Sequence, residues 1–557
     1  MRFVPVRAAI LGALFAAIIT LPGLGNGTLW DNSETVYGEV AREVLVMHDW
    51  VVMHLNGAEW FIQPPLFFWI AALFAKLLGV TAFALRLPAA LATIAMGGAL
   101  GYATARVAGT RAGTVAAIAL STSLMQAIVG RLAIMDALLD LCVVIAILCW
   151  FRALQQHDHP DDARRRSTAF LCGTLALACG MLVKGPVAPV IVVLVIGVWL
   201  AWEWRSGAPI AVPPAATLFG ACVLFFVIAA PWFVLEAIRV GPTAAGELIG
   251  HYTIGRYTGV IENQRGPWWY YVPVVILGFF PWIAFVPVAA GSAIGAARTR
   301  AGSLDRLAIV WIVAPLVFFS FAQTKLPNYV ALILPALAIV VALWFERVAD
   351  ADDRRAAIAS ALTIPLFIGA LGIAIVIFIR NNHYESATAI VGPQVEVLGV
   401  LMLIGSLVTV AAVATRNWNW LAPYVLGATS GALVLFIAFV AEPAAEALKP
   451  IPPLAAIIQA QRSPGSVVGV RGVAGTYALI FYTAPGVVTL EEDNSDFRVS
   501  SCAPPDLFLV TRLADVPALT RLVAAEGRHS ATVGQARGVA VIHIDGPRCA
   551  EGSRRPT

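Results

Sequence analysis

Acidic side chains gather directly behind the first apolar run of the chain. Asp31, Glu34 and Glu39 lie within residues 30–39, although only 13% of the 557 residues are charged. Carboxylates at the mouth of a membrane span are costly to keep there and usually take part in function. We predict Asp31 and Glu34 to be catalytic, deprotonating or orienting an attacking hydroxyl from one face of a helix. The alternative is a helix cap, with Asp31 at N-cap and Glu34 at N3.

A third acid stands where a later apolar run begins. Asp136 lies in the segment GRLAIMDALLDL, with Arg131 one turn earlier and Asp140 one turn further in. An ionisable group inside a span is a functional candidate by default. We therefore predict Asp136 as a catalytic residue and Arg131 as its partner or as a substrate ligand. Alternatively, neighbouring helices satisfy the two acids.

Three isolated cations suggest that the ligand carries a phosphate. Lys184 lies in VKGPVA, Arg256 in GRYTG, and Lys325 in KLPNYV with Tyr329 close behind. Cations placed around carboxylates are expected for a phosphate-bearing substrate. The alternative for each lysine is an ordinary loop residue.

Several other chemistries lack a signature in this chain. It has no H-E-x-x-H, no Walker loop, no G-x-S-x-G elbow and no basic stripe with interleaved aromatic residues. We therefore expect no direct nucleotide donor and no nucleic acid. No cofactor is indicated, and a divalent metal is left open without a ligand signature.

The elements that must position these residues are membrane spans, because 59% of the chain is hydrophobic. We predict a mainly α, polytopic membrane protein with about thirteen spans. The apolar runs lie at 8–25, 84–104, 112–129, 134–152, 168–183, 185–203, 216–236, 269–290, 306–322, 329–346, 357–379, 394–414 and 419–441.

Charge placement orients these spans. If 65–80 does not cross, the arginine-rich loops all fall on one side, which is the cytoplasm by the positive-inside rule. We therefore predict that 59–80 forms juxtamembrane helices in the outer leaflet. The candidate site residues then share the opposite face. We predict a transmembrane domain over 1–441, with 26–83 as its first loop on the outer face.

The composition changes at residue 442. A proline-rich linker, EPAAEALKPIPPL, precedes five short β-like runs (SVVGVRG, ALIFYTA, GVVTL, DLFLVTR and GVAVIHI) and one helical stretch, DVPALTRLVAAEG. We predict a small α/β domain outside the membrane over 442–557. Cys502 and Cys549 in it can form a disulfide in an oxidising compartment or remain free thiols.

Taken in order, these segments resemble polyprenyl-phosphate-dependent glycosyltransferases of the GT-C class, closest to the lipid A aminoarabinose transferase (ArnT-like) group. Protein O-mannosyltransferases are more distant relatives. The matching segments span most of residues 26–345 and include SETVYGEVAREVL, QPPLFFW, GRLAIMDALL, VKGPVA, RGPWWYY and KLPNYV. The resemblance implies a GT-C fold of about thirteen spans in a bacterial inner membrane. It also implies that the first loop, 26–83, and the C-terminal domain, 442–557, are periplasmic.

The resemblance also assigns site positions. It implies donor-phosphate or substrate contacts for Tyr37, Lys184, Arg256, Lys325 and Tyr329, and it matches Glu34 and Asp136 to acidic motif positions.

Three motif positions depart from the family. Ser33 stands at the family's aspartate position, and Asp31 can substitute for it. Gln63 replaces a lysine expected at the donor phosphate, and Ile62 replaces a glutamate that would be a metal ligand. These departures favour a related enzyme with another sugar or acceptor as much as strict aminoarabinose transfer.

We therefore predict an inverting hexosyl or pentosyl transferase that takes sugar from undecaprenyl phosphate or a similar polyprenyl phosphate. The acceptor would be lipid A, a glycan or a protein on the periplasmic face, and the enzyme would act as a monomer among membrane lipids. The alternatives are a lipid or solute transporter, which requires a polar path at the midplane of the spans, and a catalytically inactive acceptor-binding relative.

Overall fold

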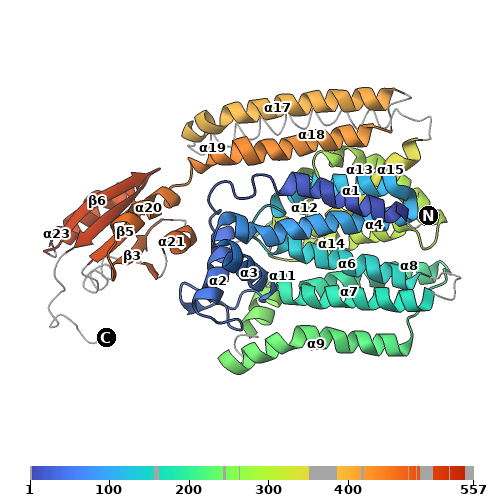
Figure 1. The fold of residues 1–557 in the computed structure, drawn as a ribbon, viewed down its shortest axis with the longest axis horizontal. Helices are drawn as coiled ribbons and strands as arrows, with labels where there is room; N and C mark the ends of the chain where they lie inside the picture. The colour runs from blue at the N-terminus through green and yellow to red at the C-terminus, as the bar shows by residue number, and fades with distance from the viewer. Residues whose placement is uncertain are drawn as a thin grey trace. The chain divides into compact units, whose positions relative to one another are not determined.

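A computed structural model describes residues 3–155, 162–241, 246–261, 264–349, 385–415, 420–473, 476–483, 486–489, 506–525 and 527–545. The chain divides into two compact units (Figure 1). The helical unit contains residues 1–26, 50–52 and 61–441, and the α/β unit contains 27–49, 53–60 and 442–557. The two units are described separately below.

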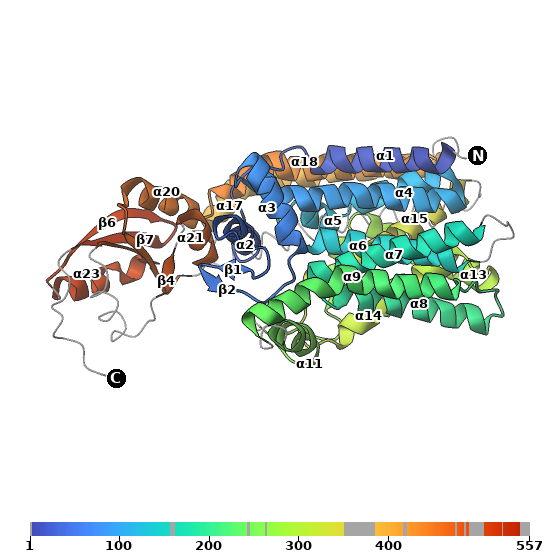
Figure 2. The same ribbon diagram turned by 60° about the horizontal axis from the view of Figure 1, so that its bottom comes forward.

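Long apolar helices lie side by side in the helical unit, as both ribbon views show (Figures 1 and 2). Short α, 3-10 and π segments connect them. The α-helices are α1 (Phe3–Thr20), α3 (Leu66–Leu78), α4 (Ala82–Ser121), α5 (Leu124–Val129), α6 (Asp136–Leu154), α7 (Asp162–Lys184), α8 (Val187–Arg205), α9 (Ala215–Val240), α11 (Arg256–Thr258), α12 (Tyr271–Gly278), α13 (Val286–Thr299), α14 (Leu304–Phe321), α15 (Leu334–Ala349), α17 (Glu385–Ala414) and α18 (Ala422–Phe436). The others are η1 (Gly246–Gly255), η2 (Trp282–Phe285), η3 (Pro327–Ile333) and η4 (Ile437–Ala441).

The described residues contain 10 helices that are long and apolar enough to cross a membrane. The predicted spans 84–104 and 112–129 fall mainly in α4, which is interrupted at Gly109, where φ is +88°. The first predicted span, 8–25, overlaps α1, which begins five residues earlier and ends at Thr20, and the predicted span 357–379 lies outside the described residues. The protein is therefore a multi-pass membrane protein, and the count of thirteen spans stays a prediction.

The expectation of helices throughout 59–80 is only partly correct. Helix α3 has 13 residues and Glu59 belongs to a short strand instead. A helix of this length rises about 20 Å, which is shorter than the roughly 30 Å hydrocarbon core of a bilayer. The structure thus agrees with the prediction that this segment does not cross.

Glycine permits close backbone contacts between helices in this unit. A Cβ on Gly113 would stand 2.3 Å from the carbonyl oxygen of Gly101, and one on Gly12 would stand 2.7 Å from that of Gly97. Helix α1 and both arms of α4 can therefore approach backbone to backbone, as small residues allow in membranes.

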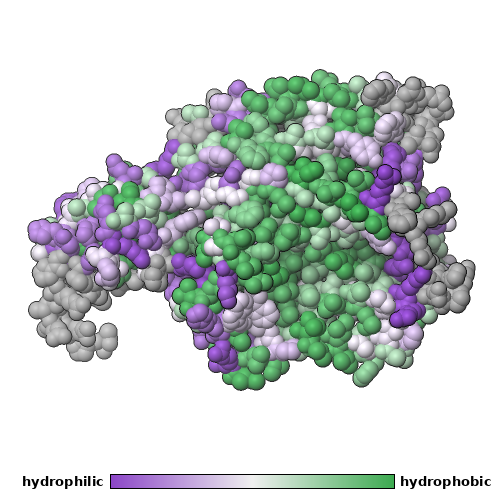
Figure 3. All heavy atoms as spheres, viewed as in Figure 1, coloured by the Kyte–Doolittle hydropathy of each residue, from purple (hydrophilic) through white to green (hydrophobic). Residues whose placement is uncertain are grey.

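The arginine-rich loops meet at one end of the helical unit. Arg306 pairs with Glu203 at 2.7 Å, and Arg347 pairs with Asp305 at 2.6 Å. Hydrophilic residues gather at this end in the surface view, whereas apolar residues cover the middle of the bundle (Figure 3). These contacts confirm the prediction that the loops around 205, 300 and 347 share one side.

The α/β unit is built on a five-stranded mixed sheet in the order β4-β3-β5-β7-β6. Strand β3 is parallel to β4 and β5, and β7 is antiparallel to β5 and β6. The strands of this sheet are β3 (Val467–Arg471), β4 (Val487–Thr489), β5 (Asp506–Arg512), β6 (His529–Ala536) and β7 (Val539–Asp545). The helices of the unit are α2 (Glu34–Val46), α19 (Glu442–Glu446), α20 (Ile451–Gln461), α21 (Thr476–Thr483) and α23 (Val516–Ala525), with a 3-10 turn η5 (Leu513–Asp515). A separate hairpin is formed by β1 (His54–Leu55) and β2 (Ala58–Glu59).

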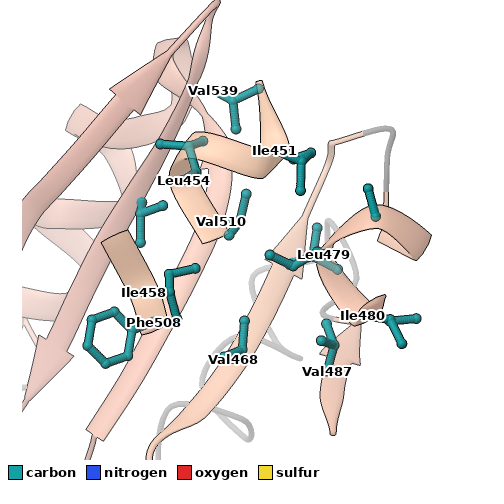
Figure 4. Packing of buried hydrophobic residues seen from close by; sticks show 13 residues of the cluster. Ile451, Leu454, Ile458, Val468, Leu479, Ile480, Val487, Phe508, Val510 and Val539 are labelled. Carbon is teal, nitrogen blue, oxygen red and sulfur yellow. The ribbon is translucent and has the colours of Figure 1, made fainter. Parts of the chain in front are cut away.

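Helices cover both faces of the sheet. Phe508 and Val510 of β5 face α20, where Leu454 is buried (Figure 4). Leu507 and Leu509 point to the other face, against α23. Because successive residues of a strand point to opposite faces, a strand covered on both sides is continuously apolar.

Two assignments in this region were wrong. The run ALIFYTA forms helix α21, and the predicted proline-rich linker contains α19 and the beginning of α20. A short apolar run cannot be assigned to strand or helix by periodicity alone, which explains the first error. The second error arose because proline is compatible with the first turn of a helix, where the backbone N–H groups have no partner within the helix. The prolines at the start of α20 therefore do not prevent it from forming.

The α/β unit also includes part of the first loop, which the sequence analysis assigned to the transmembrane domain. Residues 27–49 and 53–60 group with 442–557. The side chain of Asn56 exchanges two hydrogen bonds with the backbone of Val487, at 2.8 and 2.9 Å. The Leu29 N–H donates to the Tyr482 hydroxyl at 2.7 Å.

Candidate functional site

A cavity of about 500 Å³ in the helical unit brings together five of the predicted site residues. They come from the start of α6, the end of α7, the segment before α3, α11 and η3. These residues are Gln63, Asp136, Lys184, Arg256 and Tyr329.

An ion pair lies at the polar side of this cavity. Lys184 Nζ donates to Asp136 Oδ1 at 2.6 Å, and Asn328 Nδ2 donates to the same oxygen at 2.7 Å. Lys184 Nζ also stands 5.9 Å from the centre of the Tyr329 ring. Asp136 is 5% exposed, so its charge is shielded from bulk water and balanced by the lysine.

Local structure places both partners of this pair at helix ends. Asp136 is the first residue of α6, and Lys184 is the last residue of α7. Each charge therefore complements the dipole of its own helix. Gly185 then adopts φ +64°, which lets the chain turn directly from α7 into α8.

Arg256 is held by a backbone pairing between two loops. Thr324 N–H donates to the Arg256 carbonyl at 3.1 Å, and Gln323 N–H donates to the Tyr257 carbonyl at 3.0 Å. The Arg256 guanidinium lies 5.8 Å from the centre of the Tyr252 ring. Arg256 is thus fixed next to the segment that leads into Asn328 and Tyr329.

The remaining walls of the cavity are mostly apolar and aromatic. A cavity with cations at one side and hydrocarbon walls at the other suits an amphiphile with an anionic group. The apolar lining residues are Ile62, Leu139, Pro186, Val187, Val190, Leu248, Ile254, Phe318, Phe319, Ala322 and Leu332.

Asp140 is a second buried carboxylate in the cavity wall. It is 2% exposed, and its Oδ2 has no hydrogen-bond partner in the described part of the chain. The sequence indicated this position through its spacing from Asp136, because residues four apart on a helix lie on the same face. Asn328 was missed because a neutral amide between a proline and a tyrosine carries no charge pattern.

Two predicted phosphate ligands do not line the cavity. Arg131 donates to the carbonyl oxygens of Thr20 and Pro22, at 2.8 and 2.9 Å, and so caps the end of α1. Lys325 Nζ donates to the carbonyls of Phe319 and Ser320, at 3.0 and 2.6 Å, and burial lowers its pKa. Both cations instead satisfy carbonyl groups near helix ends.

Asp31, Glu34 and Tyr37 belong to the α/β unit. Helix α2 begins at Glu34, so Asp31 lies in the turn before it and not on the helix. Asp31 Oδ1 accepts a hydrogen bond from Ala478 N–H at 2.7 Å, in the first turn of α21. Glu34 Oε2 accepts from Trp30 N–H at 3.0 Å. The alternative of a capping box, with Asp31 at N-cap and Glu34 at N3, is therefore wrong, because Ser33 holds the N-cap position of α2.

The third acid of the first loop is also buried. Glu39 is 1% exposed and pairs with Arg42 one turn later. Burial raises the pKa of Glu39 to about 7, against the opposing effect of Arg42. No group of three or more His, Cys, Asp or Glu side chains with metal-binding geometry occurs among the described residues.

Comparisons with known proteins identify the family of this chain. The family profile described as dolichyl-phosphate-mannose-protein mannosyltransferase matches residues 62–234. Undecaprenyl phosphate-alpha-4-amino-4-deoxy-L-arabinose arabinosyl transferase from Pectobacterium carotovorum is 30% identical over 75% of this chain and 73% of its own length. The chain belongs to this arabinosyl transferase family. The corresponding protein of Edwardsiella ictaluri is 29% identical over 75% of this chain and 74% of its own length.

Solved structures agree on the fold. ArnT from Cupriavidus metallidurans, crystallised with undecaprenyl phosphate, superposes with a TM-score of 0.81 at 21% identity, covering 97% of this chain and 99% of that one. The Archaeoglobus fulgidus oligosaccharyltransferase gives 0.53 at 11% identity, covering 94% and 71%. The resemblance found in the motifs is confirmed, and the protein is a membrane glycosyltransferase with the GT-C fold.

Proposed function

We propose that this protein transfers a sugar from a polyprenyl phosphate donor, of the undecaprenyl type, to a lipid A, glycan or protein acceptor. The reaction would take place at the periplasmic face of the inner membrane. The observation that carries the proposal is the cavity in which Lys184 and Arg256 stand beside apolar walls. The names of the relatives support the donor class.

Lys184 and Arg256 are proposed to hold the donor phosphate. Displacement at the anomeric carbon leaves the lipid phosphate with additional negative charge, which nearby cations stabilise. Gln63 lines the same cavity and can donate hydrogen bonds without adding charge. The isoprenoid chain would lie along the hydrocarbon walls formed by α8 and α14.

Two acids of α6 are proposed to act in the cavity, Asp136 on the lysine and Asp140 on the sugar. Asp136 Oδ1 holds Lys184 and Asn328, so it fixes the cation that receives the phosphate. Asp140, buried one turn away without a partner on Oδ2, would accept a hydrogen bond from a sugar hydroxyl.

Asp31 and Glu34 are proposed to order the loop that contains them. Their carboxylates already accept backbone N–H groups at 2.7 and 3.0 Å. A direct role in the deprotonation of the acceptor is the competing proposal, and activity in folded variants separates the two.

The experiment uses the purified protein in proteoliposomes with radiolabelled undecaprenyl phosphate sugars, both pentoses and hexoses, and lipid A as acceptor. The wild type should transfer label, whereas Lys184→Met and Arg256→Gln should not. Arg265→Gln is the matched control, because Arg265 lies nearby and does not line the cavity. Equal transfer by Lys184→Met, Arg256→Gln and the wild type would refute the proposed donor site.

Glu34→Gln and Asp31→Asn complete the set. Transfer close to the wild-type rate by both variants, with normal thermal unfolding, supports a role in ordering the loop. A large loss of transfer in a normally folded Glu34→Gln would instead assign the chemistry to Glu34. Lipid extracts from a deletion strain, compared with wild type by mass spectrometry, would identify the product.

A further inference from the structure

A second cavity of about 490 Å³ lies in the helical unit, away from the proposed donor site. It is lined by α1, by the part of α4 just before the break at Gly109, by the C-terminal part of α6 and by the start of α14. Arg152 lines it, 16 residues after Asp136 on helix α6. That separation corresponds to about 24 Å along the helix axis, so the two cavities occupy opposite ends of the bundle.

The cavity combines hydrocarbon walls with a basic rim. Ala99, Ala103 and Leu148 contribute apolar surface, and Arg106 and Arg152 contribute two guanidinium groups. No acidic residue is among those that line it in the described part of the chain.

Other arginines at this end are paired differently. Arg111, Arg306 and Arg347 each form an ion pair, with Glu346, Glu203 and Asp305 respectively. The rim of the second cavity thus has an excess of positive charge that its own lining does not balance.

Helix ends cannot supply the attraction for an anion here. Arg152 lies in the last turn of α6, and Arg106 lies three residues before the break of α4 at Gly109. Both positions are near the carbonyl ends of helical segments, which repel anions. Any anion must therefore be bound by the arginine side chains, whose planar groups suit phosphate oxygens.

We propose that this cavity binds one anionic glycerophospholipid of the surrounding membrane. Its phosphate would bridge Arg106 and Arg152, and an acyl chain would lie against the small residues of α4. Membrane exposure supports this occupant, because Tyr102 and Val107 beside the cavity are 40% and 59% exposed on a membrane-spanning helix. Basic pockets between spans at the cytoplasmic side are known to favour anionic headgroups.

The lipid would have a structural effect as well. Two guanidinium groups in one apolar recess repel each other, and a shared phosphate removes that repulsion. Binding should therefore stabilise the contact of α4 with α6. The inference does not depend on the proposed glycosyl transfer, and its test measures binding and unfolding only.

The test is native mass spectrometry of the full-length protein with dioleoyl phosphatidylglycerol or dioleoyl phosphatidylcholine. Wild type should retain one phosphatidylglycerol under conditions that remove phosphatidylcholine, and its Tm should rise only with the anionic lipid. The double variant Arg106→Gln/Arg152→Gln should lose both effects. Arg205→Gln is the control, since Arg205 is an exposed arginine outside this cavity.

A second variant tests the cavity without changing charge. Ala99→Leu should fill the apolar recess and lower phosphatidylglycerol retention at least fivefold while Arg106 and Arg152 are intact. Equal retention of the two lipids by wild type would overturn the proposal. So would undiminished phosphatidylglycerol binding in the double arginine variant.

Discussion

At the scale of single residues, the cavity is organised around the pair of Lys184 and Asp136. The 2.6 Å contact joins two helix ends that are 48 residues apart in the chain. Each charge depends on the other, because a buried charge without a partner destabilises the folded protein and tends toward its neutral form. Removal of either partner should thus disturb the other.

We expect Lys184→Met and Asp136→Asn each to lower kcat/KM for the donor by roughly 10²–10³-fold, the usual effect of losing one charge-stabilising group. The double variant should lose little more than the worse single variant, since the two act as a unit. Steady-state kinetics in proteoliposomes measure this. Losses that multiply would show that the two side chains act independently.

Gln63 offers a gain-of-function prediction. It lines the cavity at the position where the family resemblance expects a lysine. Gln63→Lys should lower the KM for the donor by about tenfold, since a hydrogen bond to a charged group contributes roughly 1.5–3 kcal/mol. Gln63→Leu is the control and should raise the KM. If the lysine has no effect on KM, the donor phosphate does not approach residue 63.

At the level of helices and strands, two basic residues that the sequence analysis predicted as ligand contacts instead bind carbonyl groups at helix ends. A helix leaves its last carbonyl groups without partners, and in a membrane protein those groups need donors from side chains. Arg131 serves α1 in this way, and Lys325 serves α14.

Arg131→Ala should therefore destabilise the protein by about 1–3 kcal/mol, through carbonyl groups left without donors. The KM of the remaining folded protein for the donor should be unchanged. Thermal unfolding and donor kinetics, with Arg131→Lys as partial rescue, measure both quantities. A raised KM at normal stability would return Arg131 to the ligand-binding set.

Glu39 in helix α2 should make the stability of the folded protein depend on pH. The pKa of Glu39 is about 7 in the folded protein and near 4.5 in the unfolded chain. Between these values the folded state binds the extra proton, so stability should fall as pH rises from about 4.5 to 7. Melting curves over this range should show a falling Tm, which Glu39→Gln should flatten. An equally steep fall in the variant would exclude Glu39 as its source.

At the scale of the whole molecule, sidedness determines what the cavity can meet. The helical unit separates the arginine-rich loops from the residues of the cavity, at opposite ends of its helices. By the positive-inside rule we predict that the cavity opens on the periplasmic side.

Labelling of intact cells with a membrane-impermeant maleimide tests this orientation. Trp268→Cys, at a site 78% exposed between α11 and α12, should react, and Arg300→Cys at the arginine-rich end should react only after permeabilisation. Wild type controls for the native cysteines. The reverse pattern would place the proposed reaction on the cytoplasmic side.

The amino-acid sequence was sufficient to predict the membrane class, the approximate position of the spans, the shared side of the arginine-rich loops and the family. These follow from local quantities, namely apolar run length, charge between runs, and short motifs in order. It also selected Gln63, Asp136, Lys184, Arg256 and Tyr329, which the structure brings into one cavity.

Only the tertiary structure separated ligand-facing charges from those that serve the backbone. Arg131 and Arg256 look alike in sequence, yet one donates to the carbonyls that end α1 and the other lines the cavity. Likewise, Asp31 caps α21, a helix 445 or more residues later in the chain that the sequence presented as a strand. Hydrogen bonds between such distant residues depend on how the helices and strands pack. The local sequence does not show which carbonyl or N–H group is left without a backbone partner in the folded chain.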